Sequence, residues 1–555
     1  MPGSFPPHVS RRWSLVAALA VGLALRLYVG LTHPIDYNGF WHVFIARNLR
    51  REYSGLAHPP LFLLLLKGVD ALSHTRMAYR SLSILSGLLA IALVHRILEK
   101  LRTDPAVAFL GALTMAASQS AIFLSRGVQS YMLAVFFILW SFVFYLDIAR
   151  PEPAGWRRRA AFAALASLAV ATEYFAGLYL VAAALAPLLV AAFRPAYRRA
   201  LRATLTRRIL PDAATLAPPA ILGTLLYESI AKPWVTRLNH LPEFYLRPGT
   251  ETPAAFVTRN LWNLFNLFSP ALLWSPRRAA ALVLLFAAVV FLAAIVSGGR
   301  EADDAERALP AAILVILLVL GMVLGLRGLY PFGGAMRQQF LFFQFGLLAG
   351  FVAFDRLVSR APSPAARRTL LFLCGAALAV NVAANSKNLL PMGRDPFTVQ
   401  AYTFDRSFPQ ARVVQTDQFN LVGFFIAHHD WAWSYDGSLP GLPAVQRYEL
   451  ARDGRRLTLL AHRDRWNFPL LEGGTYAVLR AAGAAAGAEC TTAFVVHQNL
   501  YKPPDRKLPP LDEVELLDAA PSLARAGGLT LRRLVSRGDD AYLELCDESG
   551  ASTSR

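Results

Sequence analysis

The segment 33–66 places reactive side chains directly after an apolar run that is long enough to span a membrane. Asp36 lies there between Pro34 and a Tyr-Asn-Gly turn, and Phe40 and Trp41 follow it. A carboxylate that is held beside aromatic rings is oriented and partly desolvated, and both effects tune a general base. We therefore interpret Asp36 as a candidate catalytic base at the membrane surface. The alternative is an ordinary, solvated loop carboxylate.

Several cationic side chains are predicted to lie on the same side of the membrane and are candidates for binding phosphate. His58 precedes Pro59-Pro60, which hold it in an extended geometry, so it either donates to a phosphate or caps a helix. Arg126, between two predicted spans, either offers a planar fork to a phosphate or snorkels at the interface. Arg337 stands at the head of a predicted span, where it can reach a lipid phosphate. Weaker candidates in another outer loop are Lys232, Arg237 and His240.

Glu173 is a carboxylate in the sequence ATEYFAGLY, at the outer end of a predicted span. Ionisable residues in membrane spans are rare and are functional candidates by default. Glu173 either pairs with an arginine or joins Asp36 in binding a divalent cation such as Mg²⁺ or Mn²⁺. We favour the pairing, because one Asp and one Glu make a sparse cation site.

The composition is that of a membrane protein. Of the 555 residues, 55% are hydrophobic and 17% are charged, whereas soluble domains carry about 25% charged residues. The net charge is +19, but the arginines and lysines separate apolar segments, as they do in cytoplasmic loops. This pattern favours anionic lipids or a lipid-linked substrate as partners and argues against nucleic acid. The sequence contains no Walker loop, no GxGxxG after a strand and no HExxH motif.

The apolar segments predict eleven spans, with the N-terminus inside and the C-terminal tail outside. The first run is long enough to remain as an anchor rather than a cleaved signal. The predicted spans are 13–31, 80–95, 106–123, 131–149, 160–174, 177–193, 209–229, 279–297, 309–326, 339–355 and 369–386.

Three further segments are predicted to be helices that lie on the membrane. Two of them follow the first span, the second starting at Pro59-Pro60, which suits a first helical turn. The third is 254–275, which would make twelve spans if it crossed the membrane. We disfavour twelve, because Arg259 and several asparagines would be costly in hydrocarbon. The loop GGREADDAER is acidic although it is predicted to lie inside.

The composition changes after Asn385 and predicts a second domain. We place a transmembrane domain at 1–389 and a small soluble α/β domain at 390–555. The predicted strands are ARVVQTD, TYAVLR, AFVVHQ and AYLELC, and NLVGFFIAHH is a predicted helix. Cys490 and Cys546 lie in this tail and could form a disulfide if the tail is extracytoplasmic. Cys374 lies in an apolar run.

The order of these motifs resembles the glycosyltransferase C-fold (GT-C) superfamily over about residues 13–386. The similarity is greatest to the family 39-type membrane enzymes, the bacterial protein O-mannosyltransferases and aminoarabinose transferases. The motifs that carry it are Asp36 after the first span, HPPL at His58–Leu61, Arg80 in AYRSLSILSGLLA, Tyr131 in SQSAIFLSRGVQSYML, the turn Thr172–Gly177, and YPFGGAMRQQFLFF with Arg337.

The resemblance implies an enzyme that moves a sugar from a polyprenyl-phosphate donor to an acceptor hydroxyl on the outer face of the cytoplasmic membrane, with inversion. It implies that Asp36 is the general base and that Glu173 orients the acceptor or assists a cation. The tail would be periplasmic, and the acceptor is a glycan, a lipid or a protein. Residues implied to bind the lipid phosphate or substrate are His58, Arg126, Tyr131, Lys232, Arg237 and Arg337.

The sequence departs from the family pattern in two places, which keeps other functions open. Tyr37 follows Asp36 where relatives carry Asp-Glu, and the second outer loop lacks its acid. Fewer carboxylates leave the metal requirement open and would fit a non-catalytic membrane scaffold. A flippase or transporter for a lipid-linked substrate is the other alternative, but it would need broken spans in paired halves and polar residues at mid-depth.

Overall fold

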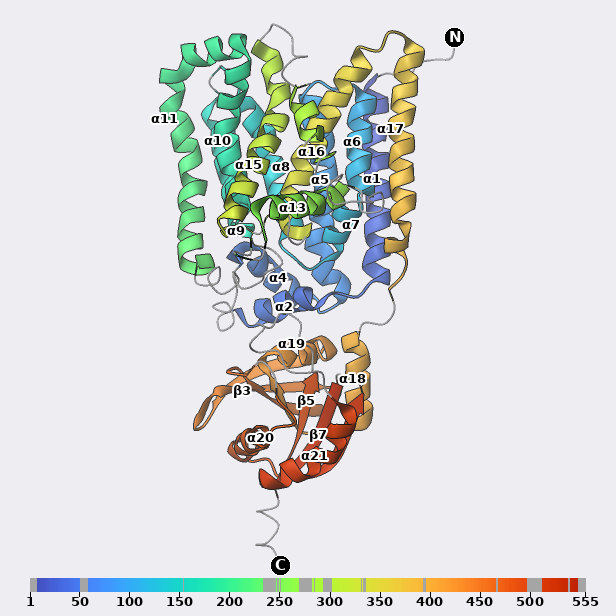
Figure 1. The fold of residues 1–555 in the computed structure, drawn as a ribbon, viewed down its shortest axis with the longest axis vertical. Helices are drawn as coiled ribbons and strands as arrows, with labels where there is room; N and C mark the ends of the chain where they lie inside the picture. Colours follow the sequence, from blue (N-terminus) through green and yellow to red (C-terminus); the bar gives the residue numbers. More distant parts are fainter. Residues whose placement is uncertain are drawn as a thin grey trace, which may run out of the picture. The chain divides into compact units, whose positions relative to one another are not determined.

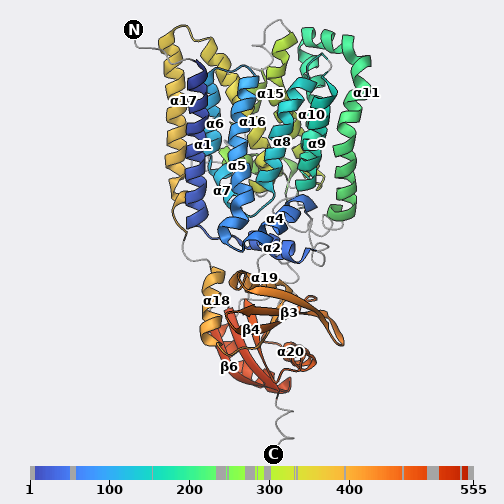
Figure 2. The same cartoon turned by 180° about the vertical axis from the view of Figure 1, so that it is seen from behind.

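A computed structural model describes most of the chain, which divides into two compact units (Figures 1 and 2). The first unit is Met1–Ile35 with Ile45–Pro391, and the second is Asp36–Phe44 with Met392–Arg555. The residues that the structure describes are 7–49, 58–152, 154–232, 246, 249, 251–268, 282–283, 285–292, 302–330, 332, 336–392, 396–465, 468–496, 512–537 and 540–547.

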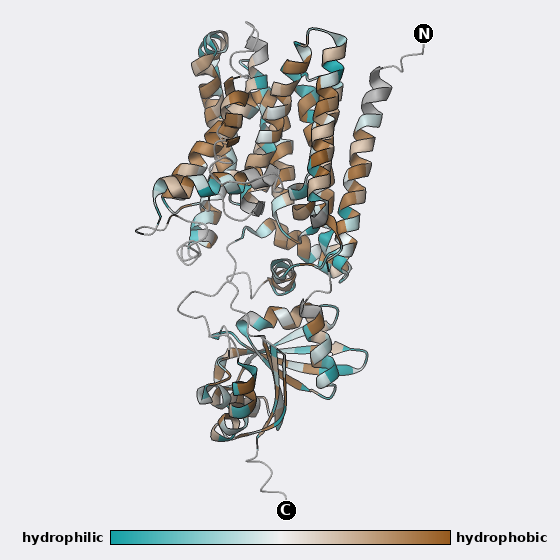
Figure 3. Ribbon diagram, turned by 45° about the vertical axis from the view of Figure 1, so that its right-hand side comes forward, coloured by the Kyte–Doolittle hydropathy of each residue, from teal (hydrophilic) through white to brown (hydrophobic). Residues whose placement is uncertain are grey.

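The first unit is a bundle of long helices that run side by side, and Figure 3 shows that most of their residues are hydrophobic. Its elements are α1 (Pro7–Thr32), α4 (Pro60–Leu72), α5 (Arg76–Lys100), α6 (Pro105–Ala117), α7 (Gln119–Arg126), α8 (Tyr131–Ile148), α9 (Trp156–Thr172), α10 (Ala176–Phe193), α11 (Pro195–Leu226), η2 (Tyr227–Ala231), α13 (Pro253–Phe268), η3 (Ala302–Ala308), α15 (Leu309–Leu326), α16 (Met336–Ser359), α17 (Pro364–Asn385) and η4 (Ser386–Leu389). Helix α2 (Tyr37–Arg47) is divided between the two units after Phe44.

Within the described residues, eight helices are long and apolar enough to cross a membrane, or nine if the bent pair α6 and α7 forms one span. The chain is therefore a multi-pass membrane protein, as its composition predicts. The predicted number of eleven spans is not confirmed. Helix α9 has 17 residues and is not among these candidates, and the predicted span 279–297 is described at 282–283 and 285–292.

The predicted span 106–123 is a bent pair of helices. Helices α6 and α7 meet at 49°. Ser118 ends the first helix and caps the second, because its hydroxyl accepts from the backbone N–H of Ala121 at 3.4 Å. A helix that stops inside a bundle leaves its last carbonyls without intrahelical donors, and these need partners in a membrane.

Arg26 of α1 supplies those partners. Its Nη1 donates to the carbonyl of Ala116 at 3.0 Å, and its Nη2 to that of Met115 at 3.4 Å. Its Nε donates to Oγ of Ser125 at 3.0 Å. Gly87 of α5 leaves room for this contact, since a Cβ there would lie 2.8 Å from Nε of Arg26 and clash with Ser125. A fully buried arginine therefore stabilises the bend.

The end of the bundle that holds the start of α1 also holds the arginine-rich loops, and we call it the arginine-rich end (Figure 1). The acidic loop that disagreed with this placement is explained by ion pairs. Glu306 of η3 accepts from Nε of Arg150 at 2.9 Å, and Arg307 of the same turn pairs with Asp355. Glu306 thus balances an arginine of a neighbouring loop, and an arginine of this loop balances Asp355.

The three surface helices are confirmed as helices. Helix α4 begins at Pro60, with Pro59 as its N-cap residue, and α2 precedes it in the chain. Helix α13 runs across the long helices (Figure 1) and is not among the candidate spans of the described residues. Arg259 on α13 is paired through two hydrogen bonds with Glu251, at 2.9 and 2.8 Å.

The second unit is an α/β domain, as predicted. Its sheet has seven strands in the order β2-β3-β4-β1-β5-β7-β6. Strand β1 runs parallel to β4 and β5, and the other neighbours are antiparallel. The strands are β1 (Val413–Asp417), β2 (Ala432–Leu439), β3 (Leu442–Arg452), β4 (Arg455–His462), β5 (Cys490–Val496), β6 (Leu529–Arg537) and β7 (Asp540–Asp547). The helices are α18 (Pro396–Ser407), α19 (Gln418–Ala427), α20 (Gly473–Ala485) and α21 (Glu513–Ala526).

One predicted strand is wrong. The segment TYAVLR lies in α20 and is helical, whereas three of the other predicted elements are strands and NLVGFFIAHH lies largely in α19. Tyr476 and Leu479 are buried at helical spacing with Ala482. The segment AAGAA that follows, residues 481–485, is rich in alanine, the strongest helix former, so the longer pattern outweighs the β-branched and aromatic residues.

Cys490 and Cys546 form a disulfide between neighbouring strands. The two residues lie directly opposite each other in the register of β5 and β7. The bond closes a loop of 56 residues that includes α21 and the edge strand β6. Cys374 in α17 is a free thiol.

We expect the variant Cys490→Ser with Cys546→Ser to lower the free energy of unfolding of the second unit by about 2–4 kcal/mol, because the closed loop restricts the unfolded chain. Alkylation of the denatured wild-type protein should label one thiol without reductant and three thiols with it. Cys374→Ser is the matched control and should remove the label seen without reductant. Labelling of all three cysteines without reductant would contradict the disulfide.

Candidate functional site

Three residues selected from the sequence come together at the end of the bundle opposite the arginine-rich end. Glu173 follows the last residue of α9 and is 6% exposed. Its Oε1 accepts from the hydroxyl of Ser130 and lies 3.2 Å from Nδ1 of His58. The ring of Tyr131 meets that of His58 edge-on, with 6.4 Å between centroids. We call His58, Ser130, Tyr131 and Glu173 the outer cluster.

Local sequence explains how each member of the outer cluster is placed. Pro59 and Pro60 start α4, so His58 is fixed just before a helix whose first turn is rigid. Ser130 is the residue before α8, and Tyr131 is its first residue. The ring of Phe175 stacks on that of Tyr131 at 6.3 Å. Two loops that are distant in sequence therefore present polar groups, those of His58 and Ser130, to the buried carboxylate of a third.

The predicted pairing of Glu173 with an arginine is not what the structure shows. The carboxylate is satisfied by a hydroxyl and an imidazole instead. A carboxylate next to one ring nitrogen fixes the orientation and tautomer of a histidine. The arrangement can therefore hold His58 in one orientation as a hydrogen-bond donor to an anionic or hydroxyl-bearing ligand.

Arg80, which belongs to one of the family motifs, is fully engaged with main-chain carbonyls. It is 1% exposed. Its Nη2 donates to the carbonyl of His33 at 2.8 Å and its Nη1 to that of Gly30. Its Nε donates to the carbonyl of Arg126 at 2.8 Å. Arg80 thus joins the end of α1 to the loop that leads to the outer cluster.

Arg126 is half-buried and lies over an aromatic ring. Its Cζ is 4.3 Å from the ring centroid of Phe123, a cation–π contact on the same helix, α7. Its own carbonyl is fixed by Arg80, so the main chain at this position is rigid. Arg126 is the last residue of α7, so it stands at the start of the loop that carries Ser130.

The other predicted phosphate ligands are not brought together by the described residues. Lys232 is exposed, and its Nζ donates to Oε2 of Glu228 at 2.5 Å, a hydrogen bond that raises the pKa of the lysine. Arg237 and His240 lie outside the described residues. Arg337 is in the first turn of α16, and its side chain also lies outside them.

Asp36 is exposed and caps a helix within the second unit. Its Oδ1 accepts from the backbone N–H of Gly39 at 2.7 Å, which is the usual bond of an N-cap residue. Next to it, burial and the charge of Asp417 raise the pKa of Tyr37. The carboxylate is thus oriented by the helix that follows it, and its catalytic role stays a prediction.

An aromatic cluster fixes the first part of α2 within the second unit. The ring of Phe40 lies 5.1 Å from that of His429. Phe44 packs on Phe425 at 5.3 Å and on Trp433 at 6.4 Å. Both phenylalanines are fully buried. The predicted apolar face of this helix therefore contacts the α/β domain, which holds the segment that begins at Asp36.

An ion pair that was not predicted from the sequence fixes the last turn of α2 within the first unit. Nε and Nη2 of Arg47 donate to the two oxygens of Asp70 on α4, at 3.0 and 2.7 Å. The hydroxyl of Tyr79 donates to Oδ1 of Asp70 at 2.7 Å, and His74 lies 3.1 Å from that oxygen. A lone aspartate in the apolar segment of α4 was the signal that could have indicated this pair.

The environment of Asp70 favours its charged form. Burial alone would raise the pKa of this carboxyl, but the hydrogen bonds and charge of Arg47, with hydrogen bonds from Tyr79 and His74, lower it below its usual value. The Arg47–Asp70 pair is nearly buried, with side chains 12% and 8% exposed. Such a pair costs more to break than a surface pair.

The described part of the chain contains no cluster of side chains that would indicate a metal site. No group of three or more His, Cys, Asp or Glu that could hold a metal ion occurs among the described residues. The outer cluster offers one carboxylate and one imidazole that already face each other. A divalent cation therefore stays a prediction, and the chemistry proposed for this site does not depend on it.

A cavity of about 440 Å³ lies at the arginine-rich end and is lined by none of the predicted site residues. Its lining comes from the end of α8, the start of α9 and the loop between them. It is therefore separate from the outer cluster, which is built from the opposite ends of the same two helices.

The class of this molecule is a multi-pass membrane protein with a soluble α/β domain and a polar cluster at one membrane boundary. Residues 70–210 match the family model described as dolichyl-phosphate-mannose-protein mannosyltransferase. The resemblance predicted from the sequence is confirmed over this segment, which contains Arg80, Arg126, Ser130, Tyr131 and Glu173. No curated protein gives a significant match to the chain.

Two solved structures are similar to the chain. The first is ArnT from Cupriavidus metallidurans bound to undecaprenyl phosphate, at 12% identity and a TM-score of 0.37, covering 96% of this chain and 98% of that one. The second is the same protein in the apo state, at 12% identity and a TM-score of 0.31, covering 81% and 98%.

We expect Arg47→Ala to lower the free energy of unfolding by about 3 kcal/mol, because Asp70 would be left buried without its cation. Thermal unfolding in detergent should show a clear drop in Tm. Lys232→Ala, which breaks the exposed pair with Glu228, is the control and should leave the Tm close to that of the wild type, because solvent screens an exposed pair.

The double variant Arg47→Ala with Asp70→Asn should recover part of the loss. The folded state lowers the pKa of Asp70, so the pair stabilises the fold above the unfolded pKa of about 4, and this contribution is lost as pH falls through the folded pKa. Equal Tm values for Arg47→Ala and Lys232→Ala would contradict the importance of this pair.

Proposed function

We propose that this protein is a membrane glycosyltransferase that moves a sugar from a polyprenyl-phosphate donor to an acceptor hydroxyl. The observation that carries the proposal is the outer cluster, a buried Glu173 that faces His58 at 3.2 Å at a membrane boundary. Three of its four members lie inside the segment that matches the mannosyltransferase family model. The acceptor is a glycan, a lipid or a protein.

In the proposed reaction the acceptor oxygen forms a bond to the anomeric carbon while the bond from that carbon to the phosphate oxygen breaks. The leaving lipid phosphate keeps the bonding electrons, and the anomeric configuration inverts. Asp36 accepts the proton of the acceptor hydroxyl as general base. The transfer needs both a base for the acceptor and cations for the leaving group.

Cationic side chains stabilise the charge that develops on the phosphate. Arg126 and Arg337 are the proposed ligands, with Lys232 and Arg237 as weaker ones. A fixed cation near lipid is worth more than in water, because the local dielectric constant is lower. Arg80 is omitted from this set, since each of its nitrogens already donates to a carbonyl.

His58 acts with Glu173 in this scheme. The carboxylate holds the ring through Nδ1, so that the imidazole is presented in one orientation to the donor phosphate or to the acceptor hydroxyl. Glu173 is therefore a positioning residue rather than a ligand of the substrate. Tyr131, whose ring meets that of His58, helps to keep this orientation.

We further propose that the arginine-rich end is cytoplasmic and that the outer cluster faces the outside of the cytoplasmic membrane. The distribution of arginine and lysine supports this orientation. The second unit would then be periplasmic, and its disulfide is typical of an oxidising compartment. The outward side is also where the proposed donor would present its sugar.

A transporter is less well supported than a transferase. The described residues contain one bent helix pair, whereas broken spans in transporters occur at corresponding positions of two halves. The buried charge at this bend is the guanidinium of Arg26, which donates hydrogen bonds to two carbonyls and a hydroxyl. A non-catalytic scaffold would leave the polar outer cluster without a purpose.

We expect Asp36→Asn to leave the protein folded and to abolish transfer, because the amide cannot accept the proton of the acceptor. The cap to Gly39 can be kept by the amide oxygen, so the helix α2 should persist. The assay is turnover of a purified polyprenyl-phosphate sugar by wild type and variant. Wild-type turnover by the variant would remove Asp36 from the mechanism.

We expect Glu173→Gln to lower kcat by about 10- to 100-fold with a smaller change in donor KM, because a misoriented His58 misplaces the reacting groups. Glutamine keeps the shape and an acceptor oxygen for Ser130, which protects the fold. Glu513→Gln, an exposed acid of α21 in the second unit, is the matched control. Equal kinetics of the two variants would argue that Glu173 has a structural role alone.

A further inference from the structure

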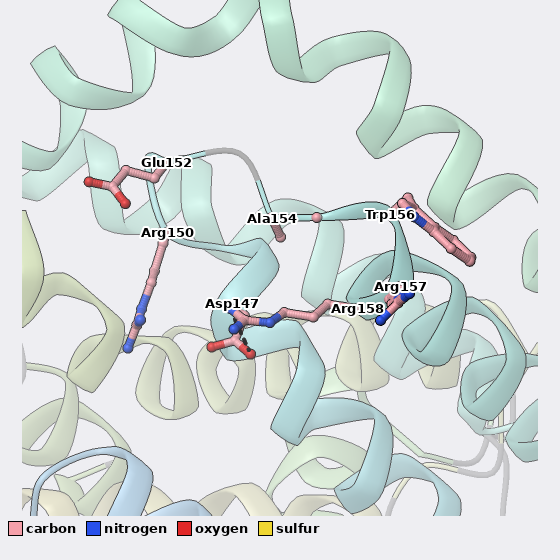
Figure 4. A pocket seen from close by; sticks show the side chains of 8 residues that line it. Asp147, Arg150, Glu152, Ala154, Trp156, Arg157 and Arg158 are labelled. Atoms are coloured by element: carbon pink, nitrogen blue, oxygen red, sulfur yellow. Dashed lines mark ion pairs between the residues drawn. The ribbon is translucent and has the colours of Figure 1, made fainter.

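The cavity at the arginine-rich end has no role in the proposed transfer, yet its chemistry is distinctive. Its volume is about 440 Å³. Figure 4 shows its lining side chains, with Asp147 next to Arg158 and with Glu152 pointing away from them. The lining residues are Asp147, Arg150, Glu152, Ala154, Gly155, Trp156, Arg157 and Arg158.

The charges of this lining leave one positive charge in excess. Asp147 is balanced by Lys100, whose Nζ lies 2.8 Å from Oδ2, while Nη1 of Arg158 is farther away at 3.5 Å. Arg150 is paired with Glu306. With these two partners counted, four cations face three carboxylates. Arg157 and Arg158 are exposed and are the cations that a ligand can reach.

An exposed tryptophan places the mouth of the cavity at the boundary of the membrane. Trp156 is 74% exposed and is the first residue of α9, and α8, which is long and apolar enough to cross a membrane, ends at Ile148. Tryptophan is enriched at the level of lipid headgroups. Cζ of Arg157 lies 5.8 Å from the centroid of its indole ring, within the range of a cation–π contact.

We propose that this cavity binds the headgroup of an anionic phospholipid from the leaflet at the arginine-rich end. Arg157 and Arg158 donate to the phosphodiester, which carries the single negative charge that the lining lacks. Helix α9 begins at Gly155–Trp156 without a side-chain cap, so its first N–H groups add to the attraction. Hydroxyls of a glycerol headgroup can donate to Asp147.

The test uses the full-length protein in nanodiscs that contain phosphatidylglycerol and phosphatidylethanolamine, with retained lipid measured by native mass spectrometry. Wild type should retain phosphatidylglycerol in preference to phosphatidylethanolamine. Arg157→Ala with Arg158→Ala should weaken that retention about 10-fold or more. The matched control removes two exposed arginines of α11 at the same end, Arg199→Ala with Arg202→Ala, and should change retention less than 2-fold.

Three outcomes would overturn the proposal. Equal losses in the two double variants would mean that overall charge, and not the cavity, holds the lipid. Equal retention of the two lipids by wild type would assign the cavity to a zwitterionic headgroup. Displacement of the bound lipid by soluble glycerol phosphate at an equal concentration of phosphate would assign it to a soluble ligand. Should the arginine variant fail to fold, Glu152→Gln must strengthen retention at least 2-fold for the proposal to stand.

Discussion

The constraint on which the first unit depends is that polar groups inside an apolar bundle have to be satisfied by the protein, because lipid offers no hydrogen bonds. Arg26 meets the carbonyls left by the bend between α6 and α7, and Arg80 meets those at the end of α1. Glu173 meets Ser130 and His58. Each of these contacts joins segments that are distant in sequence, so satisfying the polar groups also determines where the outer loops lie.

This constraint explains why the outer cluster is well placed although it is built on loops. The main chain at Arg126 is held by Arg80, and four residues later Ser130 reaches Glu173. On the other side, the two prolines after His58 start α4, whose Asp70 is tied to Arg47 and Tyr79. His58, Ser130 and Glu173 thus lie next to residues that are held by buried polar contacts, which is what a preorganised site requires.

The sequence alone predicted the features that depend on local pattern. The length of the apolar segments predicted the long helices, and the paired prolines predicted the start of α4. The change of composition after Asn385 predicted the α/β domain. The bend after Ala117 was missed, because its cause is Arg26, about 90 residues away. The helix at TYAVLR was missed because six residues are too short to separate a strand from a helix. The partners of Glu173 were also missed, because His58 and Ser130 reach it only through tertiary contacts.

The same residue type, arginine, serves different purposes here, and burial separates them. A guanidinium whose nitrogens donate to carbonyls, as in Arg26 and Arg80, is committed to the fold and cannot also form a fork with a phosphate. Arg126 lies half-exposed over Phe123, and Arg157 lies exposed near Trp156. Both lie over or near an aromatic ring, a contact that uses the face of the guanidinium. The contacts that the guanidinium nitrogens already make therefore decide which motif arginine can bind a lipid phosphate. Arg80 is excluded because its nitrogens donate to main-chain carbonyls.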